Sequence, residues 1–160
     1  MASFTIQSES DERTIALGRI LGGLLRQGDT VGLAGELGSG KTWFTKGIAQ
    51  GLGVPPGIIV ASPSFALVNE YEGVITLYHM DIYRLESEGE FISAGLEEYL
   101  YSKGVAVVEW ADRWPGILPE QSLWVRFEIV DDRHREVTLS GHHPRAVEMI
   151  ESFEKGVERG

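Results

Sequence analysis

The residues with the clearest chemistry form one glycine-rich segment, Gly35-Glu36-Leu37-Gly38-Ser39-Gly40-Lys41-Thr42. Two glycines five positions apart, followed by Lys and then Thr, fit the P-loop pattern. Glycines let successive backbone N–H groups turn toward phosphate oxygens, and the helix that follows directs its positive N-terminus to the same place. The Lys41 side chain would reach the β- and γ-phosphates of a nucleotide, and the Thr42 hydroxyl would bind Mg²⁺. The segment therefore predicts a nucleoside triphosphate site.

Two carboxylates are candidates for the second acidic group that a P-loop site needs near its metal. Asp81 follows the run Leu77-Tyr78-His79-Met80, and Glu109 follows the run 105–108. The second run is apolar throughout, which favours a buried strand behind Glu109, whereas His79 makes the first run an imperfect match. Both carboxylates stay candidates, and together with Lys41 they form the predicted catalytic set.

The sequence also bears on the base and on the reaction. Asn69 is the only asparagine and Glu70 follows it, so the Asn-Lys-x-Asp element that reads guanine is absent. The one Asp-x-x-Gly, at 29–32, precedes the P-loop, which is the wrong order for a GTPase. We therefore expect adenine. These residues leave three activities open: ATP hydrolysis, phosphoryl transfer to a small molecule, and nucleotide-dependent binding without hydrolysis.

Hydrophobic periodicity predicts the elements that position these residues. A strand at 30–34, the P-loop and a helix at 41–52 follow one another, and the apolar run 105–108 predicts a strand buried on both faces of a parallel sheet. Around them we expect a helix capped by Ser10 that continues to Gly28, a hairpin of 65–71 and 74–80, a helix at 86–100 broken near Gly95, two later paired strands at 123–130 and 136–139, and a closing helix at 144–157. The predicted fold is α/β: a three-layer, P-loop NTPase-like domain with a mostly parallel central sheet and antiparallel strands added toward the C-terminus.

Composition narrows the class of protein further. The chain has 160 residues, 42% of them apolar and 24% charged, without a repeat or linker, which predicts one domain over residues 1–160. The absence of cysteine excludes a disulfide scaffold, a thiolate nucleophile and Cys-ligated metal sites. The formal net charge of −10 argues against direct binding to DNA or RNA, because phosphate contacts need clustered Lys and Arg. Residues 1–14 lack a signal-peptide pattern and no apolar stretch approaches the about 20 residues of a membrane span, so we expect a cytoplasmic protein without membrane contact.

Several segments, taken together, resemble the bacterial TsaE (YjeE) ATPase family. Beside the P-loop they are Ser62-Pro63-Ser64-Phe65, Leu-Val-Asn-Glu-Tyr at 67–71, Tyr-His-Met-Asp-Ile-Tyr-Arg-Leu at 78–85, Gly-Leu-Glu-Glu-Tyr at 95–99 and Val108-Glu109-Trp110. The resemblance implies an ATPase that uses ATP and Mg²⁺ and is needed to make threonylcarbamoyladenosine in tRNAs that read codons beginning with A. It also implies that the partner is the TsaD–TsaB heterodimer, which ATP hydrolysis would reset, and that tRNA is reached only through that complex.

The resemblance further implies roles for individual residues. Thr42 and Glu109 would hold Mg²⁺, and Glu109 could also orient the attacking water. Asp81 resembles the family's Walker B acid. Ser64 stands where the family usually has threonine, and Ala111 where proline is common. The nucleotide-binding set would be Thr14, Glu36, Leu37, Gly38, Ser39, Gly40, Lys41, Thr42, Asp81 and Arg133, with Ser62, Pro63, Ser64, Phe65 and Trp110 in two switch segments.

Overall fold

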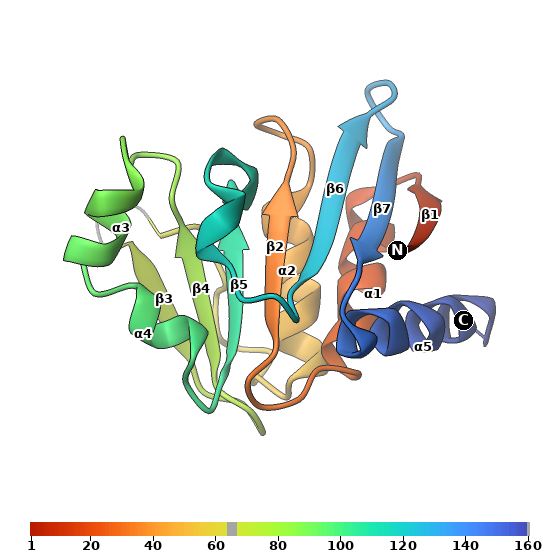
Figure 1. The fold of residues 1–160 in the computed structure, drawn as a ribbon. Coiled ribbons are helices and arrows are strands. Elements are labelled where there is room, and N and C mark those ends of the chain that lie inside the picture. The colour runs from red at the N-terminus through yellow and green to blue at the C-terminus, as the bar shows by residue number, and fades with distance from the viewer. Residues whose placement is uncertain (64–66, 160) are drawn as a thin grey trace.

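The computed structural model describes residues 1–63 and 67–159, which form one mixed sheet with helices on both faces (Figure 1). The strands are β1 (Ala2–Ser8), β2 (Thr30–Ala34), β3 (Val68–Tyr71), β4 (Leu77–Asp81), β5 (Val105–Glu109), β6 (Leu123–Ile129) and β7 (Arg135–Gly141). The α-helices are α1 (Asp11–Gly22), α2 (Lys41–Gly51), α3 (Glu88–Ser93), α4 (Glu97–Leu100) and α5 (Pro144–Arg159), and the short 3₁₀ helices are η1 (Ala111–Arg113) and η2 (Pro115–Ile117). Within the described residues the strand order is β1-β7-β6-β2-β5-β4-β3.

The central part of the sheet is parallel. β6, β2, β5 and β4 run in one direction, whereas β3 pairs antiparallel with β4, β7 with β6, and β1 with β7. This topology confirms the predicted α/β class. Within the described residues the two expected hairpins form as β3–β4 and β6–β7, and β6 lies inside the sheet, beside β2. The N-terminal residues carried no strand prediction, yet β1 forms one edge of the sheet because Ala2, Phe4 and Ile6 pack against the core.

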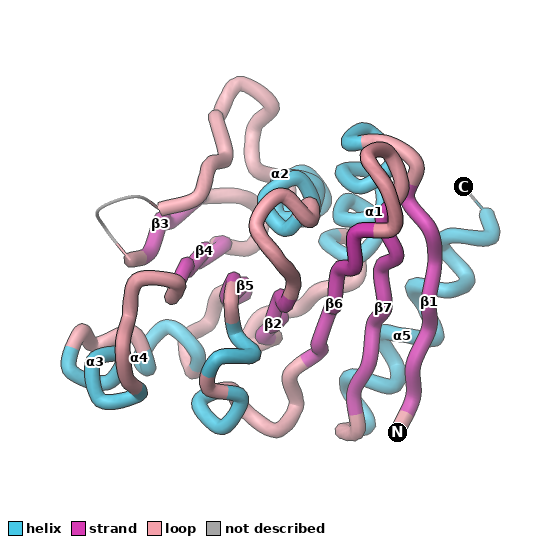
Figure 2. Tube along the Cα trace, turned by 90° about the horizontal axis from the view of Figure 1, so that it is seen from above, coloured by secondary structure: helices cyan, strands magenta, loops and turns pink. Residues whose placement is uncertain are grey.

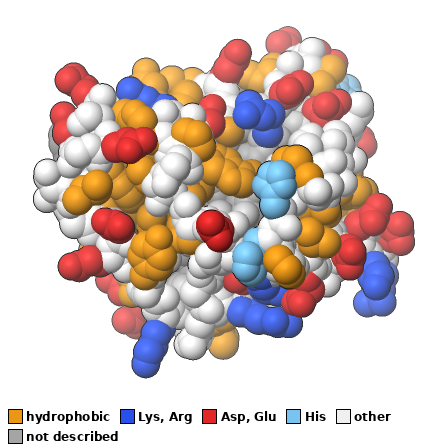
Figure 3. Space-filling model, in the orientation of Figure 1, with side chains coloured by type: hydrophobic (Ala, Val, Ile, Leu, Met, Phe, Trp, Pro, Cys, Tyr) orange, Lys and Arg blue, Asp and Glu red, His pale blue; other side chains and the backbone are white. Residues whose placement is uncertain are grey.

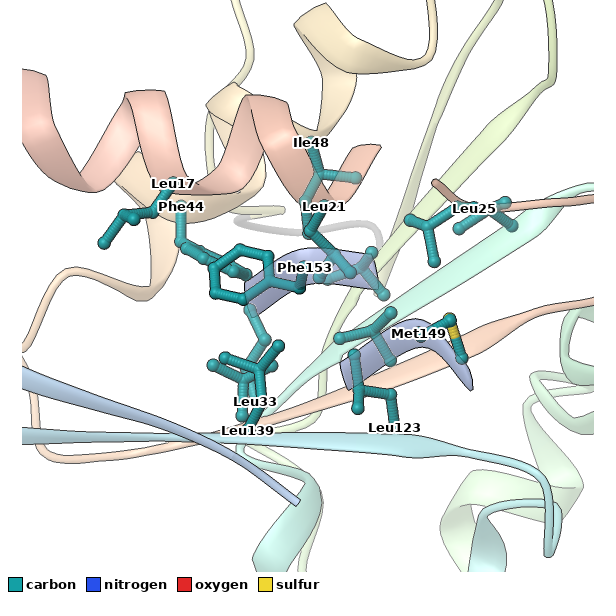
Figure 4. Close-up of a cluster of buried hydrophobic side chains, with 14 of the residues drawn as sticks. Leu17, Leu21, Leu25, Leu33, Phe44, Ile48, Leu123, Leu139, Met149 and Phe153 are labelled. Carbon is teal, nitrogen blue, oxygen red and sulfur yellow. The ribbon is translucent and has the colours of Figure 1, made fainter. Parts of the chain in front are cut away.

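Helices cover the sheet in two layers (Figure 2). α1, α2 and α5 pack on one face, and α3, α4, η1 and η2 on the other. On β5, Val105 and Val107 face the first layer while Ala106 and Val108 face the second, which explains the unbroken apolar run. In the part of the chain that the structure describes, no helix is both long and apolar enough to cross a bilayer. Figure 4 shows the larger core, in which labelled side chains of the three helices meet those of the sheet: Leu17, Leu21, Phe44, Ile48, Met149 and Phe153 above Leu33, Leu123 and Leu139.

Helix boundaries follow local signals with one exception. The Ser10 hydroxyl caps α1, as expected, by accepting a backbone N–H of the first turn. α1 ends at Gly22 rather than at Gly28, because residues 23–25 form a turn that carries the last apolar side chains of the run into the core. The break near Gly95 is confirmed: Gly95 has φ +73° and separates α3 from α4.

α1 and α2 cross with their backbones in contact. Gly18 and Gly22 of α1 meet Gly47 and Gly51 of α2. A Cβ atom placed on Gly47 would lie 2.0 Å from the carbonyl oxygen of Ile15, a distance that only movement of a helix could relieve. Small residues spaced four apart allow helices to approach this closely. Since α2 begins directly after the P-loop, this contact determines where the loop lies.

We expect Gly47→Ala to destabilise the protein by about 1–3 kcal/mol through overpacking. Alanine is the better helix former by about 1 kcal/mol, so the steric conflict must outweigh a favourable term. Urea unfolding measures the difference. Gly23→Ala is the matched control, because the nearest atom to its added Cβ would be 3.6 Å away. Equal unfolding midpoints for the two variants would contradict the proposed backbone contact.

Candidate functional site

The P-loop and both candidate carboxylates meet at the C-terminal ends of the parallel strands β2, β5 and β4. The register pairs Leu33 with Glu109 and Glu109 with Asp81. Side chains at paired positions of adjacent strands point to the same face of a sheet, so the two carboxylates share the face covered by α2. The chain leaves β2 directly into the P-loop and then enters α2. Parallel pairing thus brings together segments that are far apart in the sequence.

Glycines allow the tight course of the P-loop. Gly35, Gly38 and Gly40 have φ values of +155°, +78° and +109°, which residues other than glycine rarely adopt. A Cβ atom on Gly35 would also lie 2.7 Å from the Ser39 hydroxyl oxygen. The loop can therefore curl around the side chain of Lys41.

The Lys41 ammonium lies inside this loop. Its Nζ donates hydrogen bonds to the carbonyl oxygens of Gly35, at 2.6 Å, and Glu36, at 2.9 Å. The same nitrogen lies 4.0 Å from the centroid of the Trp110 ring, within range of a cation–π contact. Burial lowers the pKa of Lys41, and nearby carboxylates, first Glu109, partly offset this. A cation is thus fixed where the loop can receive phosphate oxygens.

Three oxygen-bearing side chains gather beside the start of α2. The hydroxyl oxygens of Thr42 and Ser62 are 2.8 Å apart. The Thr42 hydroxyl donates to Glu109 Oε1 and the Ser62 hydroxyl to Glu109 Oε2, both at 3.4 Å. Hard cations such as Mg²⁺ prefer oxygen ligands and usually take only one or two carboxylates, with phosphate and water completing the shell. This donor set fits Mg²⁺ bound together with a nucleotide, although the described residues contain no group of three His, Cys, Asp or Glu side chains that would hold a metal alone.

Asp81 lines the same pocket, next to Glu109 in the strand register. Its carboxylate accepts a hydrogen bond from the backbone N–H of Tyr83 at 3.0 Å. Burial raises the pKa of Asp81, the Tyr83 N–H opposes this rise, and the charge of Glu109 adds to it. The pocket is lined by Leu37, Gly38, Gly40, Lys41, Thr42, Trp43, Ser62, Asp81, Glu109 and Trp110.

A second hollow opens on the other side of the P-loop. It brings Thr14 and Arg133 beside Gly38 and Gly40, within the set Glu9, Ser10, Asp11, Glu12, Thr14, Gly38, Gly40, Asp132, Arg133 and Arg135. The Thr14 side chain is buried; its hydroxyl oxygen lies 2.7 Å from that of Ser8 and donates to the Ser10 carbonyl at 3.2 Å. Arg135, which has no local signal in the sequence, donates to the Gly38 carbonyl at 3.2 Å and so ties the β6–β7 hairpin to the P-loop.

Other residues of the predicted site are placed as follows. Trp110 has φ +65°, unusual for a residue with a side chain, and its ring packs on that of Tyr83 at 4.8 Å between centroids. Pro63 lines a separate hollow with Asp81 and Tyr83. Ser64 and Phe65 lie outside the described residues.

His79 is a neighbour of the site to which no role was assigned from the sequence, although it lies within the segment 78–85 that carries the family resemblance. Its side chain is fully buried, and its Nε2 is hydrogen bonded to Glu109 Oε2. A further signal is the polar His79 between Leu77 and Met80, which are both buried apolar residues of β4. The residue that makes the β4 run an imperfect match is therefore the one in contact with Glu109.

We expect Asp81→Asn to stabilise the protein at pH 7 when neither nucleotide nor Mg²⁺ is present. Because burial raises the pKa of Asp81 above its unfolded value, the ionised carboxylate reduces stability at neutral pH. This cost disappears as the pH falls below the ordinary aspartate pKa of about 3.9. Asparagine keeps an oxygen that can accept the Tyr83 N–H.

Urea unfolding in EDTA at several pH values checks this expectation. The midpoint of Asp81→Asn should exceed that of the wild type at pH 7, and the difference should shrink toward pH 4. The exposed Asp132→Asn serves as the control and should leave the midpoint unchanged. A lower midpoint for Asp81→Asn at pH 7 would show that the carboxylate stabilises the fold instead.

Comparison with known proteins identifies the family of the chain. The family model described as "Threonylcarbamoyl adenosine biosynthesis protein TsaE" matches residues 8–137. A Treponema pallidum protein named tRNA threonylcarbamoyladenosine biosynthesis protein TsaE is 42% identical over 133 residues, which are 83% of this chain and 97% of that protein. A Bacillus subtilis protein of the same name is 43% identical over 130 residues, which are 81% of this chain and 80% of that protein. The crystal structure of Bacillus subtilis YdiB superposes with a TM-score of 0.82 at 34% identity, covering 96% of this chain and 95% of that one. The chain therefore belongs to the TsaE family of threonylcarbamoyladenosine biosynthesis proteins.

Proposed function

We propose that this protein is a Mg²⁺-dependent ATPase that supports threonylcarbamoyladenosine formation in tRNAs reading codons that begin with A. The observation that carries the proposal is the meeting of Lys41, Thr42, Asp81 and Glu109 around one pocket. An ammonium, a hydroxyl and two carboxylates beside a glycine-rich loop are the groups that phosphoryl transfer from a nucleotide requires. The names of the relatives support the role in tRNA modification.

Each residue would have a separate task. Backbone N–H groups of the loop and the N-terminus of α2 would bind the phosphates, and Lys41 would contact the β- and γ-phosphates. Thr42 and Glu109 would hold Mg²⁺, which when bound neutralises charge on the phosphate oxygens. Glu109 or Asp81 would orient the attacking water, since both carboxylates line the pocket. Trp110 contacts Lys41 directly and would therefore sense a change in the position of that side chain.

Hydrolysis by the protein alone should be slow. Among the described residues that line the pocket, Lys41 is the one cation. Charge that develops during phosphoryl transfer is often stabilised by a further cation from a partner protein. We propose that the TsaD–TsaB heterodimer is this partner, and that ATP hydrolysis resets the complex between turnovers.

The charge of the chain supports an indirect contact with tRNA. The formal net charge is −10, and on the face shown in Figure 3 most Lys and Arg side chains lie apart, interspersed with Asp and Glu. Clustered basic residues are needed to bind a phosphate backbone. We propose that TsaD–TsaB binds the tRNA and that this subunit acts in the cytoplasm through protein contacts, without binding DNA or a membrane.

Release of free phosphate from ATP, with and without TsaD–TsaB, tests the proposal. We expect the pair to stimulate hydrolysis, and Asp81→Ala and Glu109→Ala each to lower the stimulated rate by about 100-fold or more. Both variants should still bind ATP in EDTA with nearly wild-type affinity, because the loop and Lys41 are intact. Glu120→Ala, an exposed change outside the pocket, is the control.

Three results would contradict the proposal. Unchanged stimulated hydrolysis in both carboxylate variants would remove Asp81 and Glu109 from the reaction. Transfer of labelled γ-phosphate to a small molecule would indicate a kinase. Absence of turnover with the partner pair present would indicate a nucleotide-dependent binding protein.

A further inference from the structure

His79 occupies a position on β4 where packing alone would favour an apolar residue. It lies on the face of the sheet that carries Leu77, within the larger core, and its side chain has 0% exposure. Burying a polar ring costs free energy unless the ring forms hydrogen bonds. Its Nε2 is bonded to Glu109 Oε2, whereas Nδ1 has no partner among the described residues. The bond to Glu109 is therefore what the described structure offers to offset the burial of this ring.

The direction of that hydrogen bond follows from its chemistry. An ionised carboxylate can only accept hydrogen bonds, so the proton lies on Nε2 of His79. Glu109 is itself buried, with 3% exposure, and its rotation is restricted by the donors around it. Oε2 receives the bonds from His79 and from Ser62, while Oε1 receives the bond from Thr42. His79 thus holds one oxygen of Glu109 and leaves the other beside Thr42.

We propose that His79 is a positioning residue that orients the Glu109 carboxylate for Mg²⁺ binding. The inference rests on the proposed function, because it assigns the purpose of the bond to the Mg²⁺–nucleotide site. A carboxylate ligand that is hydrogen bonded from behind has a defined orientation and loses less freedom when it binds a metal. The Ser62 hydroxyl is the weaker of the two constraints on Oε2, since its distance is 3.4 Å and Ser62 is less buried than His79.

A merely structural role for the ring predicts a different response to substitution. Glutamine places its amide nitrogen about as far from Cα as Nε2 of histidine, so His79→Gln keeps a donor that reaches Glu109. Asparagine carries the same amide on a shorter side chain, which ends near the position of Nδ1. Leucine fills the space without any donor. If only packing matters, the effects of the three substitutions should not depend on whether the new side chain can donate a hydrogen bond to Glu109.

The test measures the affinity for the non-hydrolysable ATP analogue AMPPNP by calorimetry, first in EDTA and then over a range of Mg²⁺ concentrations. The affinity for AMPPNP should rise with added Mg²⁺ to a plateau, and the quantity compared is the Mg²⁺ concentration at half of that rise. We expect this concentration to be about 10- to 100-fold higher in His79→Leu and His79→Asn than in the wild type. His79→Gln should stay within about three-fold of the wild type. Affinity in EDTA should be the same for all four proteins, because the phosphate-binding loop is unchanged, and thermal melting in EDTA checks that each variant is folded.

Two results would overturn the inference while leaving the proposed function intact: Mg²⁺ dependence in His79→Leu and His79→Asn within about three-fold of the wild type, or a shift in His79→Gln as large as theirs. His79→Asn keeps the comparison available if the leucine variant does not fold. A wild-type protein whose AMPPNP affinity does not depend on Mg²⁺ would instead contradict the proposed function, and the inference would fail with it.

Discussion

The parallel register of three strands is the constraint on which the rest of the structure depends. Because β2, β5 and β4 run in the same direction, Leu33, Glu109 and Asp81 lie in one row at the edge of the sheet where the P-loop begins. A slip of β5 by one residue would turn Glu109 to the other face, among the apolar side chains beneath α3 and α4. The burial of Val105 and Val107 on one face and of Ala106 and Val108 on the other makes such a slip costly. The core therefore determines the position of the carboxylate.

The two helix layers complete this arrangement in different ways. On one side, the glycine contact between α1 and α2 holds the first turn of α2, with Lys41 and Thr42, against the row of carboxylates. On the other side, η1 follows β5 directly, and the left-handed backbone of Trp110 between them brings its ring over the Lys41 ammonium. Sparsely populated backbone conformations persist where the surrounding structure maintains them, and they are frequent at functional sites. The ammonium is thereby held between loop carbonyls and an aromatic ring.

Local patterns in the sequence were sufficient for the parts of the site that depend on neighbouring residues. The P-loop glycines, the following helix and the apolar strand that ends at Glu109 all have short-range signatures, and the structure brings Lys41, Asp81 and Glu109 to one pocket. Features that depend on distant pairing had no such signature. The close approach of α1 and α2 becomes visible only when both helices are placed. β1 is a different case, because apolar and polar residues alternate strictly from Ala2 to Gln7 and form a local strand signal for which no strand was predicted.

Two polar residues at the site likewise show their contacts only once the strands are paired. His79 makes an otherwise apolar strand irregular, and its meaning emerges only when β5 places Glu109 beside it. Arg135 lies at the start of β7, and its side chain donates a hydrogen bond to the Gly38 carbonyl in the P-loop. No spacing along the chain predicts this contact. Residues that support a site from neighbouring strands thus depend on the topology of the sheet, whereas residues of the loop itself depend on the local sequence.

A crystal structure of the protein with AMPPNP and Mn²⁺, with anomalous scattering used to locate the metal, would show whether the P-loop, Thr42 and Glu109 form one metal–nucleotide site. We expect phosphate groups within the P-loop beside Lys41, and one Mn²⁺ peak in contact with the Thr42 hydroxyl on the side of the α2 N-terminus that faces Glu109. Phosphates bound outside the P-loop, or a metal peak remote from both Thr42 and Glu109, would contradict this expectation.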